Sequence, residues 1–224
     1  CIKGSKNYNS DVIRTLKNPV YHEGSLAVLK GNLAPDGAVI KPAAMDPKFQ
    51  KHNGPAIVAD SYAELKEIIN DEDYPITADH ILVLRNAGPK GGPGMPEWGM
   101  IPMPKALLKQ GHRDMIRLSD ARMSGTSYGA CILHVAPEAF IGGPLALIRT
   151  GDIIQVDIPN RKLDVDISKS EMKKRRKDWV APKPRYERGY GYIYSKHIEQ
   201  ADKGCDFDFL STDFGAAVEE PEIN

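Results

Sequence analysis

Between residues 26 and 166 the sequence consists of short apolar runs, most of them bounded by glycine or proline. Runs with this length and these boundaries are typical of β-strands. Such brief strands do not sustain a long open edge, so they favour a sheet that closes on itself or curves strongly. The runs lie at residues 26–29, 38–40, 55–59, 80–85, 114–118, 130–135, 152–157 and 162–166. The run at 130–135 fits either a strand or the start of a helix.

Helical patterns lie between and after these runs. Asp60 and Ser61 can cap a helix over residues 62–70, whose apolar side chains are spaced to form one buried face. The last two runs are joined through Pro159 and Asn160, which is a hairpin signature. Further helices are predicted at 103–110, 168–178 and 192–202. The pattern therefore predicts a mixed α/β, β-rich fold: a closed or strongly curved, barrel-like sheet flanked by helices and followed by a C-terminal arm.

Charge gives little sign of a polyanionic partner. The 224 residues include 30 basic and 30 acidic side chains, so the formal net charge is zero. A nucleic-acid-binding protein usually has a basic footprint, and we expect no nucleic acid here. The one basic cluster, at residues 173–177, lies in a predicted helix and favours a solvated face over a phosphate-binding or membrane-binding role.

Cysteine usage and hydropathy bear on the compartment. Cys1, Cys131 and Cys205 are widely spaced and form neither a CxxC pair nor a metal-ligand spacing with histidine, which favours a reducing compartment. No apolar run approaches the roughly 18 residues of a membrane span, and the N-terminus lacks the layout of a signal peptide. We therefore expect a cytoplasmic protein with no membrane partner, unless targeting signals lie outside this segment.

A polar turn at residues 119–129 is the strongest candidate for chemistry. It joins two apolar runs and contains the hydroxyls of Ser124, Thr126 and Ser127 together with Gly125. Such a turn can bring backbone N–H groups and a serine oxygen to an anionic ligand, because glycine tolerates conformations that other residues avoid. A solvated loop is the alternative, and composition alone favours it.

The segment 86–97 has four glycines and three prolines in twelve residues, which predicts a loop. Its Gly91–Gly92 pair can cradle an anion through backbone N–H groups. The spacing fits neither the GxGxxG fingerprint nor a P-loop, so nucleotide binding is unsupported. Glu97 ends the loop as either a metal ligand or a carboxylate that favours a helix N-terminus.

Two reactive side chains lie in the apolar run at 130–135. Cys131 has apolar neighbours, and a free thiol in such a run is usually a small core residue. His134 has apolar neighbours too, which favours a buried core histidine over a catalytic one.

Three blocks of the sequence resemble a known family, the dihydroxy-acid and sugar-acid dehydratases, often grouped with 6-phosphogluconate dehydratase. The blocks are Gly91–Glu97 (GGPGMPE), Ser119–Gly125 (SDARMSG) and the stretch from His134 to Ile154, and the resemblance covers roughly residues 20–210. The turn sequence SDARMSGTSYG and the arm at 186–210 look like the sugar-acid (aldonate) branch. The branched-chain enzymes more often show the pattern DGRFSGG and lack that arm.

This resemblance implies the C-terminal domain alone, a barrel similar to the swivelling domain of aconitase-type enzymes. Residues 1–25 would be a lead-in from an N-terminal domain, 26–180 the barrel, and 181–224 an arm and tail that pack on it or on a neighbouring subunit. Family members are homodimers or dimers of dimers, and their N-terminal domain carries the cysteines of an iron–sulfur cluster and most Mg²⁺ ligands. Some sugar-acid members end in a histidine that reaches a neighbouring site, whereas this chain ends in EIN.

Site residues follow from the same resemblance. Glu97 matches a Mg²⁺ ligand, Ser124 the proposed base, and Thr126 with Gly125 a substrate-binding position. The supporting residues are Gly91, Gly92, Gly94, Asp120 and Arg122.

The implied activity is dehydration of a sugar acid to its 2-keto-3-deoxy acid, which requires Mg²⁺ and an iron–sulfur cluster whose ligands this chain lacks. The chain by itself is expected to be inactive. Two alternatives remain open: a branched-chain 2,3-dihydroxy-acid dehydratase, and a binding or assembly module that has kept the fold without catalysis.

Overall fold

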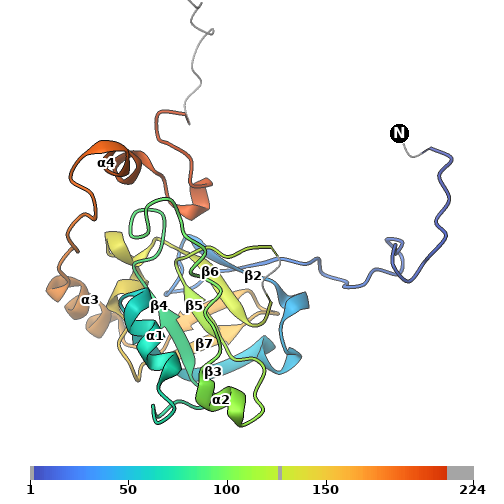
Figure 1. Cartoon of the computed structure of the whole chain (residues 1–224), viewed down its shortest axis with the longest axis horizontal. Coiled ribbons are helices and arrows are strands. Elements are labelled where there is room, and N and C mark those ends of the chain that lie inside the picture. The colour runs from blue at the N-terminus through green and yellow to red at the C-terminus, as the bar shows by residue number, and fades with distance from the viewer. Residues whose placement is uncertain (1–2, 126–127, 211–224) are drawn as a thin grey trace, which may run out of the picture.

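The computed structural model describes residues 3–125 and 128–210, which form an eight-stranded mixed sheet with helices around it (Figure 1). The strand order is β1-β2-β6-β5-β4-β3-β7-β8. The strands are β1 (Ala27–Leu29), β2 (Gly37–Ile40), β3 (Lys51–Ala59), β4 (Ile81–Leu84), β5 (Arg117–Ser119), β6 (Cys131–Ala136), β7 (Ile153–Asp157) and β8 (Lys162–Val165). The helices are α1 (Tyr62–Asn70), α2 (Lys105–Lys109), α3 (Lys169–Asp178) and α4 (Gly189–His197).

The two outer strands meet and nearly close the sheet into a barrel. The Lys30 N–H donates to the Arg161 carbonyl (2.9 Å), and the Leu163 N–H donates to the Lys30 carbonyl (3.0 Å). Gly31 permits this approach, because a Cβ there would overlap the Leu163 carbonyl. The predicted barrel-like, β-rich α/β fold is confirmed, and the edges that short strands would expose are paired with each other.

Parallel pairing in the middle of the sheet determines where the important loops emerge. β4 pairs in parallel with β3 and with β5, and Leu84 at the end of β4 lies opposite Ser119 at the end of β5. All four residues of β4 are buried, as expected for a central parallel strand. The loops that follow β4 and β5 therefore leave the same edge of the barrel side by side.

Local sequence signals account for the helices. The Ser61 hydroxyl accepts the Glu64 N–H (3.2 Å). α1 buries Leu65, Ile68 and Ile69 of the predicted face, whereas Ala63 of that face is exposed. α3 starts after its cap Ser168, but its basic cluster is not entirely solvated. Arg175 forms an ion pair with Asp152 across the helix–barrel contact. No helix in the described ranges combines the length and apolar character that crossing a membrane requires.

Several predicted elements differ in extent. The strand predicted at 114–118 begins only at Arg117, because the Asp114 side chain binds backbone N–H groups of neighbouring segments. The helix predicted at 192–202 is replaced by α4 and a short 3-10 turn, Ala201–Lys203. Four more 3-10 turns lie at Pro42–Ala44, Pro47–Gln50, Ala139–Ile141 and Pro144–Leu147.

The arm and the N-terminal segment lie outside the barrel. In the arm, Tyr186 and Tyr190 are exposed, and the Arg185 guanidinium lies over the Trp98 ring (5.6 Å). Residues 3–26 contain no helix or strand. Their first part extends away from the barrel (Figure 1), whereas Glu23 pairs with Arg161 and Leu26 lines a pocket on the barrel.

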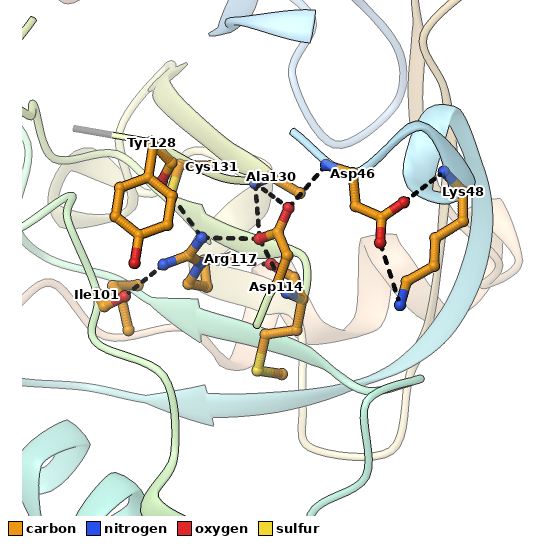
Figure 2. A network of polar contacts seen from close by, with 9 residues as sticks. Asp46, Lys48, Ile101, Asp114, Arg117, Tyr128, Ala130 and Cys131 are labelled. Carbon is orange, nitrogen blue, oxygen red and sulfur yellow. Dashed lines mark hydrogen bonds and ion pairs between the residues drawn. The ribbon is translucent and has the colours of Figure 1, made fainter. Parts of the chain in front are cut away.

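A buried ion pair underlies the turn after β5 (Figure 2). The Arg117 guanidinium, 1% exposed, donates to the Asp114 carboxylate (2.9 Å) and to the Ile101 carbonyl (2.9 Å). The same carboxylate accepts the Ala130 N–H (2.9 Å) just before β6. Gly129 has φ +91°, and a Cβ there would overlap the guanidinium. The pair therefore joins the start of β5 to the start of β6.

We expect Asp114→Asn to lower the free energy of unfolding by about 3–5 kcal/mol, because the Arg117 charge would stay buried without its partner. Urea denaturation of the variant and the parent protein measures this. Glu72→Gln, which removes an exposed ion pair with Lys109, is the matched control and should change stability by less than about 1 kcal/mol. Equal losses in the two variants would contradict a structural role for the buried pair.

Candidate functional site

The loops after β4 and β5 contact each other at the edge where both strands end. The Asp120 carboxylate accepts the Ala87 N–H (2.9 Å), and the Gly99 N–H donates to the Arg122 carbonyl (2.8 Å). Gly99 is required by this contact, because a Cβ there would lie 2.6 Å from the Arg122 carbonyl oxygen. The structure thus brings the glycine-rich loop and the polar turn, predicted separately, into one site.

Glu97 and Arg122, both predicted site residues, form an ion pair. Arg122 Nη1 lies 2.9 Å from Glu97 Oε1, and Arg122 Nε donates to the Met95 carbonyl. The Glu97 side chain is 50% exposed. Next to it, the Trp98 ring stacks on Tyr62 at the start of α1 (5.8 Å between centroids). The end of the loop is therefore anchored, and the Glu97 carboxylate lies at the surface.

The anion held by the glycine-rich loop is a carboxylate of this same chain. Both oxygens of the fully buried Glu138 accept the Lys90 N–H (2.9 and 3.1 Å), and one accepts the Gly91 N–H (2.9 Å). The Gln200 side-chain amide also donates to this carboxylate (2.7 Å). The hypothesis that Gly91 and Gly92 cradle a bound anion is therefore replaced, since Glu138 occupies the Gly91 amide and the Gly92 N–H donates to Gly88 (2.7 Å).

The glycines of this loop have separate roles. A Cβ on Gly88 would lie 2.7 Å from Glu138 Oε2, and a Cβ on Gly91 would lie 2.6 Å from the Asn86 carbonyl oxygen. Gly94 faces open space but has φ +83°, a conformation that favours glycine. The loop is thus folded tightly around an internal carboxylate, which fixes the position of Glu97 at its end.

Asp120 is a second fully buried carboxylate, and it lies near Glu138. Its oxygens accept the N–H groups of Ala87 (2.9 Å) and Ala139 (2.8 Å). Burial, and secondly the charge of Glu138, raise the pKa of Asp120 to about 7. Burial also raises the pKa of Glu138. Through these two hydrogen bonds Asp120 joins the glycine-rich loop to the residues that follow β6.

Ser124 and Gly125 line a pocket of about 230 Å³ together with residues of β2 and β6. Lys41 lies on the same wall and donates from its ammonium group to the Gly125 carbonyl (3.1 Å). Thr126, predicted to contact substrate, lies outside the described residues, as does Ser127. Glu97 does not line this pocket. The remaining walls are mostly apolar and include Leu26, Val39, Ile40, Met123 and Leu133.

The two reactive side chains of β6 differ in environment. Cys131 is buried, as expected for a small core residue, and burial raises the pKa of its thiol, although it also lines the pocket that holds Ser124. The prediction of a core histidine is wrong for His134, because its half-buried ring lines the pocket that holds Ser124. Burial, and secondly the charge of Arg122, lower the pKa of His134.

The described side chains could supply only part of a Mg²⁺ site and none of an iron–sulfur site. In residues 3–125 and 128–210 no three His, Cys, Asp or Glu side chains gather into a metal-binding group. Glu97 offers one carboxylate, so this chain fits Mg²⁺ as the source of a single oxygen ligand. Cys131 and Cys205, the two cysteines among the described residues, do not fit an iron–sulfur cluster, because neither belongs to a group of three potential ligands.

Sequence reasoning missed Glu138, Lys41 and Gln200. Glu138 lies in one of the blocks used for the resemblance, but its partners are 47 or more residues away in sequence. Lys41 follows an apolar run as an ordinary surface lysine would. No local signal identifies such residues, because their roles depend on long-range contacts.

Comparison with known proteins gives consistent matches. Residues 11–205 match the family model described as dihydroxy-acid/6-phosphogluconate dehydratase, C-terminal. The chain is 51% identical over 220 residues to a 6-deoxy-6-sulfo-D-gluconate dehydratase of Pseudomonas putida. This match covers 97% of this chain and 38% of that protein. The chain is 45% identical to an L-arabinonate dehydratase of Rhizobium leguminosarum bv. trifolii (97% and 38%) and 46% identical to a dihydroxy-acid dehydratase of Acetivibrio thermocellus (91% and 36%). The chain thus spans less than two fifths of the length of these relatives.

We expect Asp120→Asn to flatten the pH dependence of stability between about pH 5 and 7. The folded protein keeps the Asp120 proton up to about pH 7, whereas the unfolded chain loses it near its ordinary pKa of 3.8. The stabilisation from this proton is full at low pH and is lost as the pH rises toward 7, at up to about 1.4 kcal/mol per pH unit.

Urea denaturation at several pH values measures this slope. Asp73→Asn is the control, because it makes the same substitution at an exposed carboxyl group. If the slopes of Asp120→Asn and Asp73→Asn are equal, Asp120 does not carry the proton.

Proposed function

The chain belongs to the dihydroxy-acid/6-phosphogluconate dehydratase family as its C-terminal domain, and we propose that it forms one wall of the active site of a hydro-lyase acting on a sugar acid. The product would be the 2-keto-3-deoxy acid. The observation that carries this proposal is that one turn, the one after β5, carries both Ser124, which lines a pocket, and Arg122, which pairs with Glu97 at the end of the glycine-rich loop.

The reaction requires removal of the proton from C2 and loss of hydroxide from C3. We assign the proton transfer at C2 to the Ser124 hydroxyl, which is a weak base unless nearby positive charge favours its alkoxide. The Lys41 ammonium, bound to the carbonyl of the adjacent Gly125, brings such a charge to the pocket wall. Arg122 adds a second charge on the same turn. These two cations also suit the substrate carboxylate.

Glu97 is the residue of this chain that would hold Mg²⁺. The ion, when bound, supplies positive charge that stabilises an enolate developing on the substrate. Glu97 presents its carboxylate at the surface, with Oε1 bound by Arg122. Its neighbour Trp98 is stacked on Tyr62, which keeps the carboxylate in place for ligands contributed from elsewhere in the protein.

A branched-chain 2,3-dihydroxy acid is the second candidate substrate. The apolar walls of the Ser124 pocket, with Leu26, Val39 and Met123 among them, favour a hydrocarbon chain over a polyhydroxy chain. The turn sequence, the arm and the names of two relatives favour the sugar acid. We retain the sugar acid as the proposal.

An N-terminal domain and further copies of the chain are the proposed protein partners. The lead-in exposes Val12, Ile13, Leu16 and Val20, each more than 60% accessible. An apolar set of this kind is expected to be covered in the complete protein. A missing cover would also explain why the Ser124 pocket is open in this domain.

We expect Ser124→Ala in the full-length protein to reduce dehydration at least about 100-fold, because the proton acceptor at C2 is lost. A panel of aldonates and branched 2,3-dihydroxy acids, assayed for 2-keto acid formation, gives both the substrate and the effect. Ser170→Ala, on exposed α3, is the control and should keep full activity. Wild-type turnover by Ser124→Ala would remove this serine from the reaction.

We expect Glu97→Gln to raise the Mg²⁺ concentration needed for half-maximal activity at least about tenfold, because a neutral amide is a poorer ligand for a hard cation. Titration of the metal-free full-length protein with Mg²⁺ measures this. Glu67→Gln, exposed on α1, is the control. An unchanged titration for Glu97→Gln would exclude Glu97 from the metal site.

A further inference from the structure

His134 occupies a bulge in β6 and has an unusual backbone conformation. Gly37 pairs with Ala136, and Val39 pairs with Leu133, so one residue of β2 lies opposite His134 and Val135 together. His134 has φ +54°, in the left-handed region that residues other than glycine rarely adopt within a strand. Bulges next to active sites redirect a side chain.

The bulge also connects β6 to the turn that carries Ser124. The His134 N–H donates to the Ala121 carbonyl (3.1 Å) in the neighbouring turn. Strained backbone conformations persist only where the surroundings fix them, and they are concentrated at functional sites. The strain at His134 is therefore associated with the same turn that positions Ser124.

The His134 ring is placed to bind a ligand. It lines the Ser124 pocket, and neither ring nitrogen makes a hydrogen bond to another residue in the described part of the chain. Burial, and secondly the charge of Arg122, lower the pKa of His134 and so favour the uncharged imidazole. An uncharged imidazole offers one donor and one acceptor, which matches a hydroxyl group, whereas a carboxylate is better matched by cations.

We propose that His134 is a substrate-contacting residue of the Ser124 pocket, where its ring hydrogen-bonds a hydroxyl group of the hydroxy acid. This inference rests on the proposed function and deepens it. It gives the two polar side chains that line the pocket beside Ser124 distinct tasks: Lys41 attracts the carboxylate, and His134 binds a hydroxyl. The apolar walls contact the carbon chain.

Substrate affinity tests the inference in the full-length protein. Asparagine tolerates the left-handed backbone and is too short to replace the ring, so His134→Asn should fold and melt like the parent. We expect roughly a tenfold rise in KM for the acid that the parent turns over fastest, and a similar rise in its Kd in the Ser124→Ala background. Arg161→Asn, also at a left-handed position (φ +57°) but in the β7–β8 turn, is the control and should change neither value.

Chemical labelling provides a readout that does not depend on turnover. Diethyl pyrocarbonate acylates uncharged imidazoles, and mass spectrometry locates the label. We expect that same acid to slow labelling of His134 several-fold and to leave the exposed His22 unaffected.

The outcomes separate the two proposals. Turnover of a hydroxy acid with unchanged KM, Kd and labelling at His134 would overturn this inference and leave the proposed function intact. If no acid of the panel is turned over or bound, the proposed function fails, and the inference fails with it.

Discussion

The buried ion pair between Arg117 and Asp114 holds the two ends of the turn that carries Ser124. Its guanidinium binds the chain before β5, and its carboxylate binds the N–H of Ala130 just before β6. Removing water from both charges is expensive, and the cost is offset only because nearly every polar atom of the pair has a partner. A long polar turn can therefore lie on the barrel with fixed ends.

Two carboxylates of the chain itself accept the backbone N–H groups of the glycine-rich loop, as a bound anion does in many other loops. Glu138 accepts N–H groups of Lys90 and Gly91, and Asp120 accepts the N–H of Ala87. Because these acceptors are part of the chain, the loop has its shape without a ligand. Gln200 binds the Glu138 side chain from the C-terminal arm, so the arm is joined to the loop that ends at Glu97.

In the candidate site that results, the described residues bring no three potential metal ligands together, and Glu97 is the one carboxylate offered to Mg²⁺. The pocket is lined by the Ser124 hydroxyl, the Lys41 ammonium and the His134 imidazole, and the Arg122–Glu97 ion pair joins the Ser124 turn to the glycine-rich loop. Their arrangement depends on β4 and β5 ending together, on the bulge in β6 and on the contact between Gly99 and Arg122. Each of these contacts joins segments that are distant in sequence.

The sequence by itself determined the elements whose signals are local: the capped helix α1, the buried strand β4 and the hairpin between β7 and β8. It also identified the two loops of the site, through their composition and the family resemblance. Only the tertiary structure decided that Glu138 fills the loop that contains Gly91, and that His134 faces the pocket. The reason is physical: periodicity and caps act over a few residues, whereas burial, ion pairing and hydrogen bonds to a side chain depend on which distant segments the closed barrel brings together.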